Sequence, residues 1–515
     1  MKLCGVEGQF ERLPAPLPMW RASVDLKQWV GAAMAVKETG GRLLSVWGTD
    51  QRSRDGHFVI SAAYAVQEGL VWLALPLGES ETGFPDLSTV FPAASRMQRA
   101  MADLLGVHAT GVSDTRPWLR HNAWPANYFP LHEGATGDEH FPEYPAEEYA
   151  FTQVEGDGVH EIPVGPVHAG IIEPGHFRFS VVGEKVLRLE ERLGYTHKGV
   201  EKRFEQTPPL LGHRLAGRIS GDSTVAYAWA YCMALESVVG VKTTESIQWV
   251  RALLLERERI ANHLGDLGAL GNDAGFAFGL SQFSLLKETW LRQNKKLFGH
   301  RFMMDCIVPG GADVSFSKAS HDELLRQCDE VERDVHLLHS IYEEHGGLQD
   351  RFIGAGRVPP SLAAELGVCG LAGRASAQSY DLRADQPWLP YDQLDVQMVT
   401  HRNGDVAARA ITRFEEIYES LRLIRKICEH LPQIMHQTKH EFAHLHGYGI
   451  GWVEGWRGDV LIALELYNGE IRRCHCHDPS WHNWPALEHA IIGNIVPDFP
   501  LINKSFNLSY SGHDL

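Results

Sequence analysis

Residues 243–267, TTESIQWVRALLLERERIANHLGDL, carry the pattern that decides the fold class of most of the chain. Their apolar side chains recur every three to four positions, which is the period of an amphipathic α-helix. Residues 225–238, 321–345 and 406–431 repeat this period. The second part of the chain is therefore predicted to be mainly α-helical. A small β element is expected around residues 177–187. A second is expected at residues 460–466, within a tail (451–498) that is strand-like and rich in turns.

The first part of the chain has a mixed pattern. Alternating residues 43–46 and 70–75 predict strands, and residues 96–105 predict a helix with four apolar side chains on one side, Met97, Met101, Leu104 and Leu105. Residues 133–160 are rich in Glu, Gly, Pro and Asp, a composition typical of a linker. We predict an α+β domain over residues 1–135, a linker over 136–160 and the mainly α-helical domain over 161–515.

Composition and charge exclude several functions. The formal net charge of −17 argues against binding nucleic acid or an anionic lipid surface, which both reward clustered basic residues. No stretch reaches the roughly 20 apolar residues that cross a bilayer, and the first twenty residues lack a signal-peptide core. The eight cysteines are scattered without a Cys-x-x-Cys pair, which fits reducing surroundings. We therefore expect a protein on the cytoplasmic side, held at the inner membrane by partner proteins.

Short motifs along almost the whole chain resemble one family. In the first domain these are Phe84-Pro85-Asp86-Leu87, Phe91-Pro92 and Trp118-Leu119-Arg120-His121. In the second domain they are Gly165-Pro166-Val167-His168, Tyr195-Thr196-His197-Lys198-Gly199-Val200-Glu201, Arg374-Ala375-Ser376, Asp381-Leu382-Arg383 and Asn483-Trp484-Pro485. The chain resembles the large subunits of group 4 nickel-iron hydrogenases, of the hydrogenase-4 and formate hydrogenlyase type. These are related to the fused 30-kDa and 49-kDa subunits of complex I.

The resemblance breaks at the metal ligands. In these hydrogenases one Cys-Gly-x-Cys and one Cys-x-x-Cys supply four thiolates to nickel and iron. The matching stretches here are Ser220-Gly221-Asp222-Ser223 and Ser509-Tyr510-Ser511-Gly512. Serine hydroxyls are hard, protonated ligands and glycine supplies none. The resemblance therefore implies no bound metal, and the sequence fits best with the energy-converting hydrogenase-related complexes that lack the nickel ligands.

The resemblance also implies candidate site residues. Ser220, Ser223, Ser509 and Gly512 would line a cavity in place of the metal ligands, with Arg374 and Asp381 close to it. His168, Glu201 and Arg457 match family positions near the reacting group and are our candidate catalytic residues. Burial could raise the pKa of Glu201 enough for proton transfer. Each has a structural alternative: a loop histidine, an ordinary helix glutamate and an arginine paired with a carboxylate. In complex I a quinone tyrosine follows three residues after the arginine that matches Arg218, with an aspartate between them. Here Gly221 stands at the position of the tyrosine and Ser220 at that of the aspartate, so the resemblance implies that the usual quinone hydrogen-bond donor is missing.

Two other groups of residues are better explained by a structural role than by a role in chemistry. Arg259 and His263 lie one helical turn apart on one face, an arrangement that the family uses in its core. Cys474-His475-Cys476-His477 has residue types that bind zinc, but in a strand these side chains alternate between two faces and cannot readily converge on one ion.

Two functions of different classes follow from the resemblance. In the first, the chain is a peripheral-arm subunit of a membrane-bound, complex I-like oxidoreductase. Electrons would arrive from a 4Fe-4S cluster in a small partner subunit and reduce a quinone or another acceptor, and ion transfer would occur through antiporter-like membrane subunits. In the second, the chain is a non-catalytic scaffold or coupling subunit of the same kind of complex. An open cavity favours the first function and a sealed one favours the second.

Overall fold

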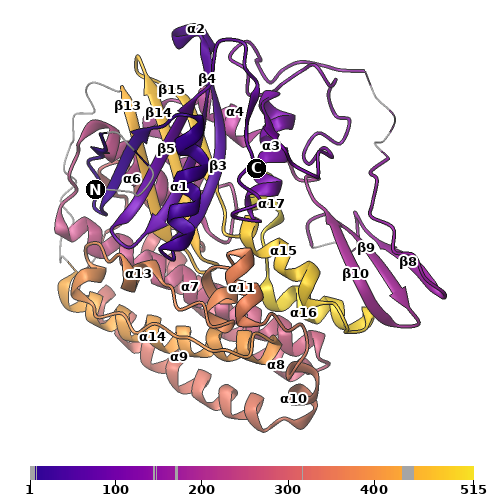
Figure 1. The fold of residues 1–515 in the computed structure, drawn as a ribbon. Coiled ribbons are helices and arrows are strands. Elements are labelled where there is room, and N and C mark those ends of the chain that lie inside the picture. Colours follow the sequence, from indigo (N-terminus) through magenta and orange to yellow (C-terminus); the bar gives the residue numbers. More distant parts are fainter. Residues whose placement is uncertain are drawn as a thin grey trace.

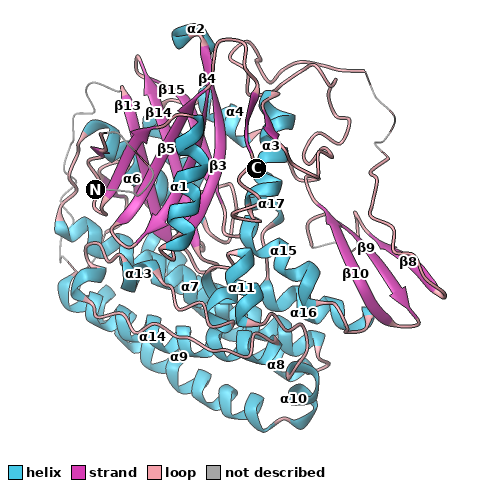
Figure 2. Cartoon of the chain, viewed as in Figure 1, coloured by secondary structure: helices cyan, strands magenta, loops and turns pink. Residues whose placement is uncertain are grey.

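The computed structural model describes residues 6, 9–142, 145, 148–168, 172–315, 317–431 and 446–515. Two β-sheets lie beside each other on one side of a layer of long helices, and a third, three-stranded sheet projects away from them (Figure 1). Strands dominate the first domain and helices the second, which confirms the predicted fold class (Figure 2). Among the described residues, no helix combines the length and apolarity needed to cross a bilayer.

The first domain is built on a five-stranded sheet with strand order β1-β2-β5-β4-β3. Strands β3, β4 and β5 are antiparallel neighbours, and β2 pairs parallel to β5. The predicted helix is α3, whose four predicted apolar side chains are all buried. The strands and helices of this domain are β1 (Glu11–Arg12), β2 (Met19–Ser23), α1 (Leu26–Glu38), β3 (Arg42–Gln51), α2 (Arg52–Asp55), β4 (His57–Val66), β5 (Gly69–Pro76), β6 (Gly83–Pro85), α3 (Ala94–Leu105) and β7 (His108–Thr110).

The second domain begins with the projecting sheet, whose strand order is β10-β9-β8. Its strands are β8 (Val159–Val164), β9 (His176–Val182) and β10 (Lys185–Arg192). The described residues between β7 and β8 form no helix or strand. They nevertheless pack on the second domain, where Arg116 donates to Glu190 at 2.6 Å and the Thr152 N–H donates to the same carboxylate at 2.8 Å. The domain limits that we place at residues 135 and 160 stay a prediction.

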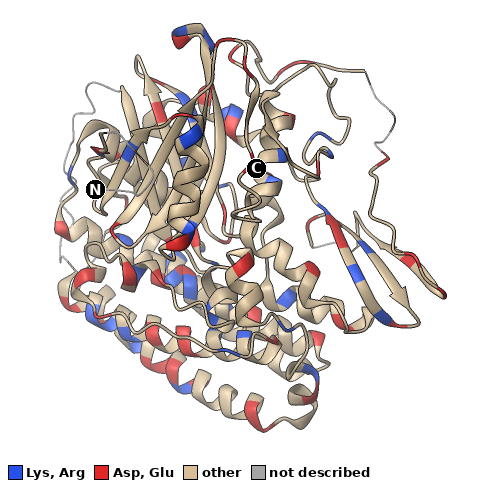
Figure 3. Ribbon diagram, in the orientation of Figure 1, with Lys and Arg blue, Asp and Glu red and all other residues tan. Residues whose placement is uncertain are grey.

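Helices form most of the remainder of the second domain. They are α4 (Val200–Glu205), α5 (Gly212–Ala216), α6 (Thr224–Val239), α7 (Glu245–Asp273), α8 (Ala277–Phe298), α9 (Lys318–Glu344), α10 (Gly346–Phe352), α11 (Pro360–Leu366), α12 (Gly370–Ala375), α13 (Leu382–Asp385), α14 (Val406–His430), α15 (Ser480–Ala490), α16 (Phe499–Phe506) and α17 (Tyr510–Asp514). Acidic and basic residues are interspersed over the outer helices (Figure 3). The antiparallel strands β13 (Gly447–Glu454), β14 (Asp459–Tyr467) and β15 (Glu470–His477) complete the domain, with the two-residue strands β11 (Ile307–Val308) and β12 (Gly311–Ala312).

All four predicted long helices are present, as α6, α7, α9 and α14, but one long helix was missed and one prediction was wrong. The 22-residue helix α8 was not predicted, because exposed Phe278 and Leu285 blur its apolar stripe. The tail contains helix α15, although it was expected to be strand-like and rich in turns. Pro485 lies inside α15 and made this helix hard to predict.

Helix α6 lies against strand β13 at very close range. The contact requires glycine, because a Cβ at Gly451 would overlap the carbonyl oxygen of Ala230, and one at Gly449 would overlap that of Ala234. Small residues on both elements therefore set the distance between the helix and the sheet.

Replacing Gly451 with alanine is expected to lower the free energy of unfolding by about 1–3 kcal/mol, because the added methyl group forces two backbones apart. The matched control is Gly31→Ala in α1, where an added Cβ meets no atom within 4 Å. That control should stabilise by up to about 1 kcal/mol through helix propensity. Urea unfolding compares the two, and equal stabilities would contradict the close contact.

The two domains meet along β3, which is an edge strand of the first sheet. Its outward carbonyl groups are satisfied by side chains of the second domain: Arg473 donates to the Gly48 oxygen and His482 bonds the Leu43 oxygen, both at 3.0 Å. Ser45 and His475 are hydrogen-bonded at 2.7 Å. An exposed edge strand invites pairing with other chains, so this contact both joins the domains and covers the edge.

Candidate functional site

The positions matched to the lost metal ligands converge, although they are almost 300 residues apart in the sequence. Ser223 lies at the N-cap of α6, Ser509 lies at the N-cap of α17, and Ser220 lies in the loop before α6. The hydroxyl oxygens of Ser220 and Ser509 are 2.8 Å apart. Ser509 also accepts a hydrogen bond from the Gly512 N–H at 2.9 Å. The sequence comparison therefore identified residues that do share one site.

An ion pair occupies the middle of this site. Arg457 donates to Asp222 at 2.8 Å, and its guanidinium stacks over the Trp456 ring at 3.9 Å. The arginine is buried, with 6% of its surface exposed. Burial would raise the pKa of Asp222, but Arg457 and then Ser220 lower it to about 2. The ion pair therefore persists at neutral pH, which is the structural alternative that we gave for Arg457.

The site has neither the donors nor the space for a nickel-iron centre. Ser220 donates to Asp222 at 2.7 Å, so Ser509 must donate to Ser220. The serine hydroxyls are thus used in bonds to each other and to a carboxylate. Soft metals of this kind need thiolates, and direct contact between Ser220 and Ser509 leaves no room between their side chains. The cavity predicted between Ser220 and Ser509 is closed, and polar bonds close it rather than apolar side chains.

Asp478 and Tyr227 belong to the same site and were missed by the sequence analysis. The Tyr227 hydroxyl donates to Asp478 at 2.7 Å, and the Ser480 N–H donates to the same carboxylate at 2.8 Å. A Cβ at Gly512 would overlap the Asp478 carboxylate, so glycine at this position makes room for it. Asp222 could have been found, because it lies inside the matched motif. Asp478 has no such local signal.

Glu201 lies elsewhere, at the junction of the two domains. Its carboxylate accepts from Arg473 at 2.8 Å, bonds His475 at 2.8 Å and accepts from the Cys476 N–H at 3.0 Å. Burial would raise the pKa of Glu201, but Arg473 and His475 lower it to about 2. The raised pKa that we considered for a proton-transfer role was wrong, because burial comes with an arginine partner.

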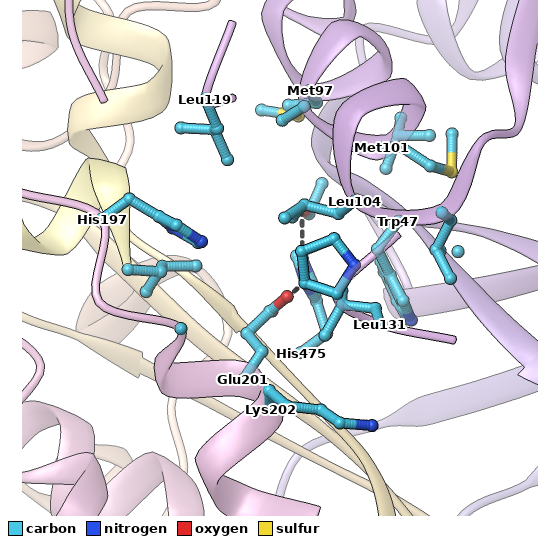
Figure 4. Close-up of a pocket in the computed structure, with 18 of the residues that line it drawn as sticks. Trp47, Met97, Met101, Leu104, Leu119, Leu131, His197, Glu201, Lys202 and His475 are labelled. Carbon is cyan, nitrogen blue, oxygen red and sulfur yellow. Dashed lines mark hydrogen bonds and ion pairs between the residues drawn. The ribbon is translucent and has the colours of Figure 1, made fainter. Parts of the chain in front are cut away.

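A small cavity of about 60 Å³ lies beside Glu201 and His475 (Figure 4). Apolar side chains of both domains line it: Met97, Met101, Leu104, Leu119 and Leu131 of the first domain, and Trp481 and Leu515 of the second. An apolar cavity of roughly 150 Å³ is needed to hold one benzene ring. The cavity is therefore too small for a quinone ring.

His168 lies near the Ser509 end of the serine site. Its ring centroid is 5.7 Å from that of Phe177 and 6.5 Å from that of Tyr510, which follows Ser509. In the described part of the chain its Nε2 has no hydrogen-bond partner. Burial lowers the pKa of His168. A neutral imidazole at pH 7 is thus placed close to Tyr510, and its Nε2 atom is buried.

Arg374 and Asp381 do not reach the serine site and instead lie in a buried charge network. Arg374 donates to Glu416 at 2.7 Å and to Glu454 at 2.8 Å, and Arg383 donates to Asp381 at 2.7 Å. His263 bonds Glu416 at 2.8 Å, and Arg259 lies 3.4 Å from the same carboxylate. These contacts agree with the structural interpretation of Arg259 and His263.

The string Cys474-His475-Cys476-His477 forms the end of β15. His475 faces Glu201 and stacks on Trp47 of the first domain with centroids 4.6 Å apart. His477 instead packs against His482 at 5.1 Å. His475 therefore joins the domains rather than forming a cluster with its sequence neighbours.

Two known families match the chain. Residues 22–140 match the respiratory-chain NADH dehydrogenase 30 Kd subunit, and residues 273–449 match the 49 Kd subunit of the same enzyme. The chain thus carries a 30-kDa-like and a 49-kDa-like complex I region, one after the other in one polypeptide.

The individual relatives are named as subunits or components of larger enzymes. Formate hydrogenlyase subunit 5 of Escherichia coli is 29% identical over 92% of this chain and 85% of its own length. Hydrogenase-4 component G of the same organism is 29% identical over 92% and 84%. A fused C/D-type component of the NADH-quinone oxidoreductase of Bacteroides thetaiotaomicron is 25% identical over 74% and 75%. The fold is also that of a protein in the archaeal membrane-bound sulfane sulfur reductase, with a TM-score of 0.66 at 23% identity, covering 70% of this chain and 99% of that one.

Proposed function

We propose that the chain is a peripheral-arm subunit of a membrane-bound respiratory oxidoreductase and that it does not activate hydrogen. One observation carries the proposal: the four matched ligand positions hold Ser220, Ser223, Ser509 and Gly512, and the space between Ser220 and Ser509 is closed by a 2.8 Å contact. The matches to the 30-kDa and 49-kDa subunits support the place in the complex. A 4Fe-4S cluster in a small partner subunit and antiporter-like membrane subunits remain part of this proposal.

In the catalytic version, an acceptor is reduced where this chain meets the iron-sulfur subunit. Asp222 supports this version because 37% of its side chain is exposed while its partner Arg457 is buried, so the ion pair presents its anionic end to the surface. His168 adds a neutral imidazole close to Tyr510, which follows Ser509 in the same site. A quinone or another acceptor would bind at this surface, because the cavity beside Glu201 holds only about 60 Å³ and Ser220 contacts Ser509 directly.

In the alternative version, the chain is a scaffold that transmits conformational change. The closed serine site favours it, because Ser220, Ser509 and Arg457 satisfy one another and Asp222 without a bound group. A site that is complete by itself needs no ligand to be stable.

Purification of the complex from membranes tests these versions. Elemental analysis should find iron without stoichiometric nickel, and hydrogen uptake should be absent. Stoichiometric nickel with hydrogen uptake would refute the proposal. The catalytic version would be established if the complex reduces a quinone or another acceptor and if the rate drops at least tenfold in Asp222→Asn. The variant complex must still assemble. Lack of turnover with every acceptor would establish the scaffold.

A further inference from the structure

The buried charge network of the helical domain contains more acids than bases. Its side chains are at most 2% exposed. In the described part of the chain four carboxylates face three guanidinium groups: Glu256, Asp381, Glu416 and Glu454 against Arg259, Arg374 and Arg383.

The neighbouring titratable groups do not correct this imbalance. His263 is fully buried, and burial lowers its pKa despite the bond to Glu416, so it adds no positive charge at neutral pH. Asp459 pairs with Arg42 of the first domain at 3.0 Å and is balanced. Asp385, at the rim, accepts from the Asp381 N–H at 2.8 Å and can only add negative charge. An uncompensated buried charge costs several kcal/mol, so one carboxylate of the four should carry a proton.

The hydrogen bonds show which carboxylate this is. Glu416 accepts two bonds from Arg374 and one from His263, with Arg259 also in reach. Asp381 accepts two side-chain bonds and one N–H from Arg383. Glu256 accepts from Arg383 through both oxygens, and from Tyr391 and Ser420.

Glu454 has the fewest donors of the four. Its carboxylate accepts one bond from Arg374 at 2.8 Å and one longer bond from the Leu382 N–H at 3.2 Å. Charge-assisted bonds favour the ionised form, and Glu454 receives the least of them. We infer that Glu454 is a proton-binding site that carries one proton at neutral pH and exchanges it when the charge around the network changes. In agreement, burial, Asp381 and Asp459 raise the pKa of Glu454 to about 7, although Arg374 and Arg259 act in the opposite direction.

The position of Glu454 connects this proton to the serine site. Glu454 ends β13, Asp459 begins β14, and the turn between them carries Trp456 and Arg457. Mutual hydrogen bonds between Gly455 and Gly458 close the turn, and a Cβ at Gly370 would overlap the Arg457 carbonyl oxygen. The proton site and the Asp222–Arg457 pair are therefore held by one closely packed turn. A role of this proton in the conformational coupling of the complex rests on the proposed function. The proton itself does not, because it can be observed in the protein without turnover.

Infrared titration of the full chain, without acceptor or turnover, tests the inference. A protonated carboxylic acid has a C=O band that ionised carboxylates lack, and wild type should lose one such band around pH 7. Glu454→Gln should lack that band, because its neutral amide replaces the protonated acid without a change in shape. The matched control is Glu258→Gln, because Glu258 is a second buried acid. Burial raises the pKa of Glu258 to about 8, and its oxygens accept hydrogen bonds from the N–H groups of Val225 and Ala226. This control should keep the band that titrates around pH 7.

A second readout is stability as a function of pH. Glu454 has a pKa of about 7 in the folded chain against 4.5 for the free side chain, so the folded state holds the proton longer. Wild type should therefore lose stability relative to Glu454→Gln as pH rises from 4.5 to 7, by about tenfold in the folding equilibrium constant per pH unit. A band titrating around pH 7 that persists in Glu454→Gln, or its loss only in Asp381→Asn, would overturn the assignment. If Glu454→Gln fails to fold, the absence of any band titrating between about pH 6 and 8 in wild type overturns it equally.

Discussion

Replacing Arg374 with alanine is expected to lower the free energy of unfolding by about 3–5 kcal/mol, which is the usual cost of removing one partner from a buried ion pair. Arg374 donates to Glu416 at 2.7 Å and to Glu454 at 2.8 Å, and lies 3.7 Å from Asp381. Its loss leaves the four carboxyl groups of the described network with two arginines, Arg259 and Arg383, instead of three. Urea unfolding followed by tryptophan fluorescence measures the change.

The matched control is Arg292→Ala, because Arg292 also pairs with a glutamate at 2.8 Å but has a 78% exposed side chain. That control should change stability by no more than about 0.5 kcal/mol, as exposed pairs on helices do. Adding Glu416→Gln to Arg374→Ala should recover part of the loss, since it removes an unpaired buried charge. If Arg374→Ala and Arg292→Ala unfold at the same urea concentration, the network does not stabilise the helical domain.

Replacing Glu201 with alanine is expected to weaken the junction of the two domains, with a loss of about 3–5 kcal/mol at pH 7. The change leaves Arg473 without its carboxylate, and it removes the bond that orients His475 toward Ser45 of the first domain. Glu161→Ala is the control, because Glu161 pairs with Arg178 at 2.9 Å while a third of its side chain is exposed.

The loss in Glu201→Ala should depend on pH in a defined direction. The pKa of Glu201 is about 2 in the folded chain and 4.5 in the free side chain, so the ionised form stabilises the folded state. This contribution is fully present above pH 4.5 and is lost as pH falls toward 2, with a total of about 3 kcal/mol. Wild type and Glu201→Ala should therefore approach each other in stability at acidic pH. A difference that grows below pH 4.5 would show that Glu201 is protonated in the folded chain and would restore its candidacy for proton transfer.

Local sequence patterns were sufficient for the long helices and for the order of the domains. Helices α6, α7, α9 and α14 each bury a face or most of their surface, so their apolar residues recur with the helical period. The four matched ligand positions were also readable, because they lie in two short motifs. Helices α8 and α15 could not be predicted. Exposed apolar residues disturb the helical period of α8, and Pro485 lies inside α15.

The chemistry of the candidate site was decided by contacts between distant residues. No local pattern indicates that Asp222 pairs with Arg457, 235 positions away, or that Ser220 meets Ser509 and closes the predicted cavity. The same holds for the two buried glutamates. Glu201 has a lowered pKa because Arg473 lies beside it, whereas the pKa of Glu454 is raised because burial and two neighbouring acids outweigh its single arginine bond. The sequence by itself determined the resemblance to the complex I subunits, four long helices and the absence of thiolates at four positions. Only the tertiary structure decided which carboxylates are ionised, because ionisation depends on partners that folding brings together.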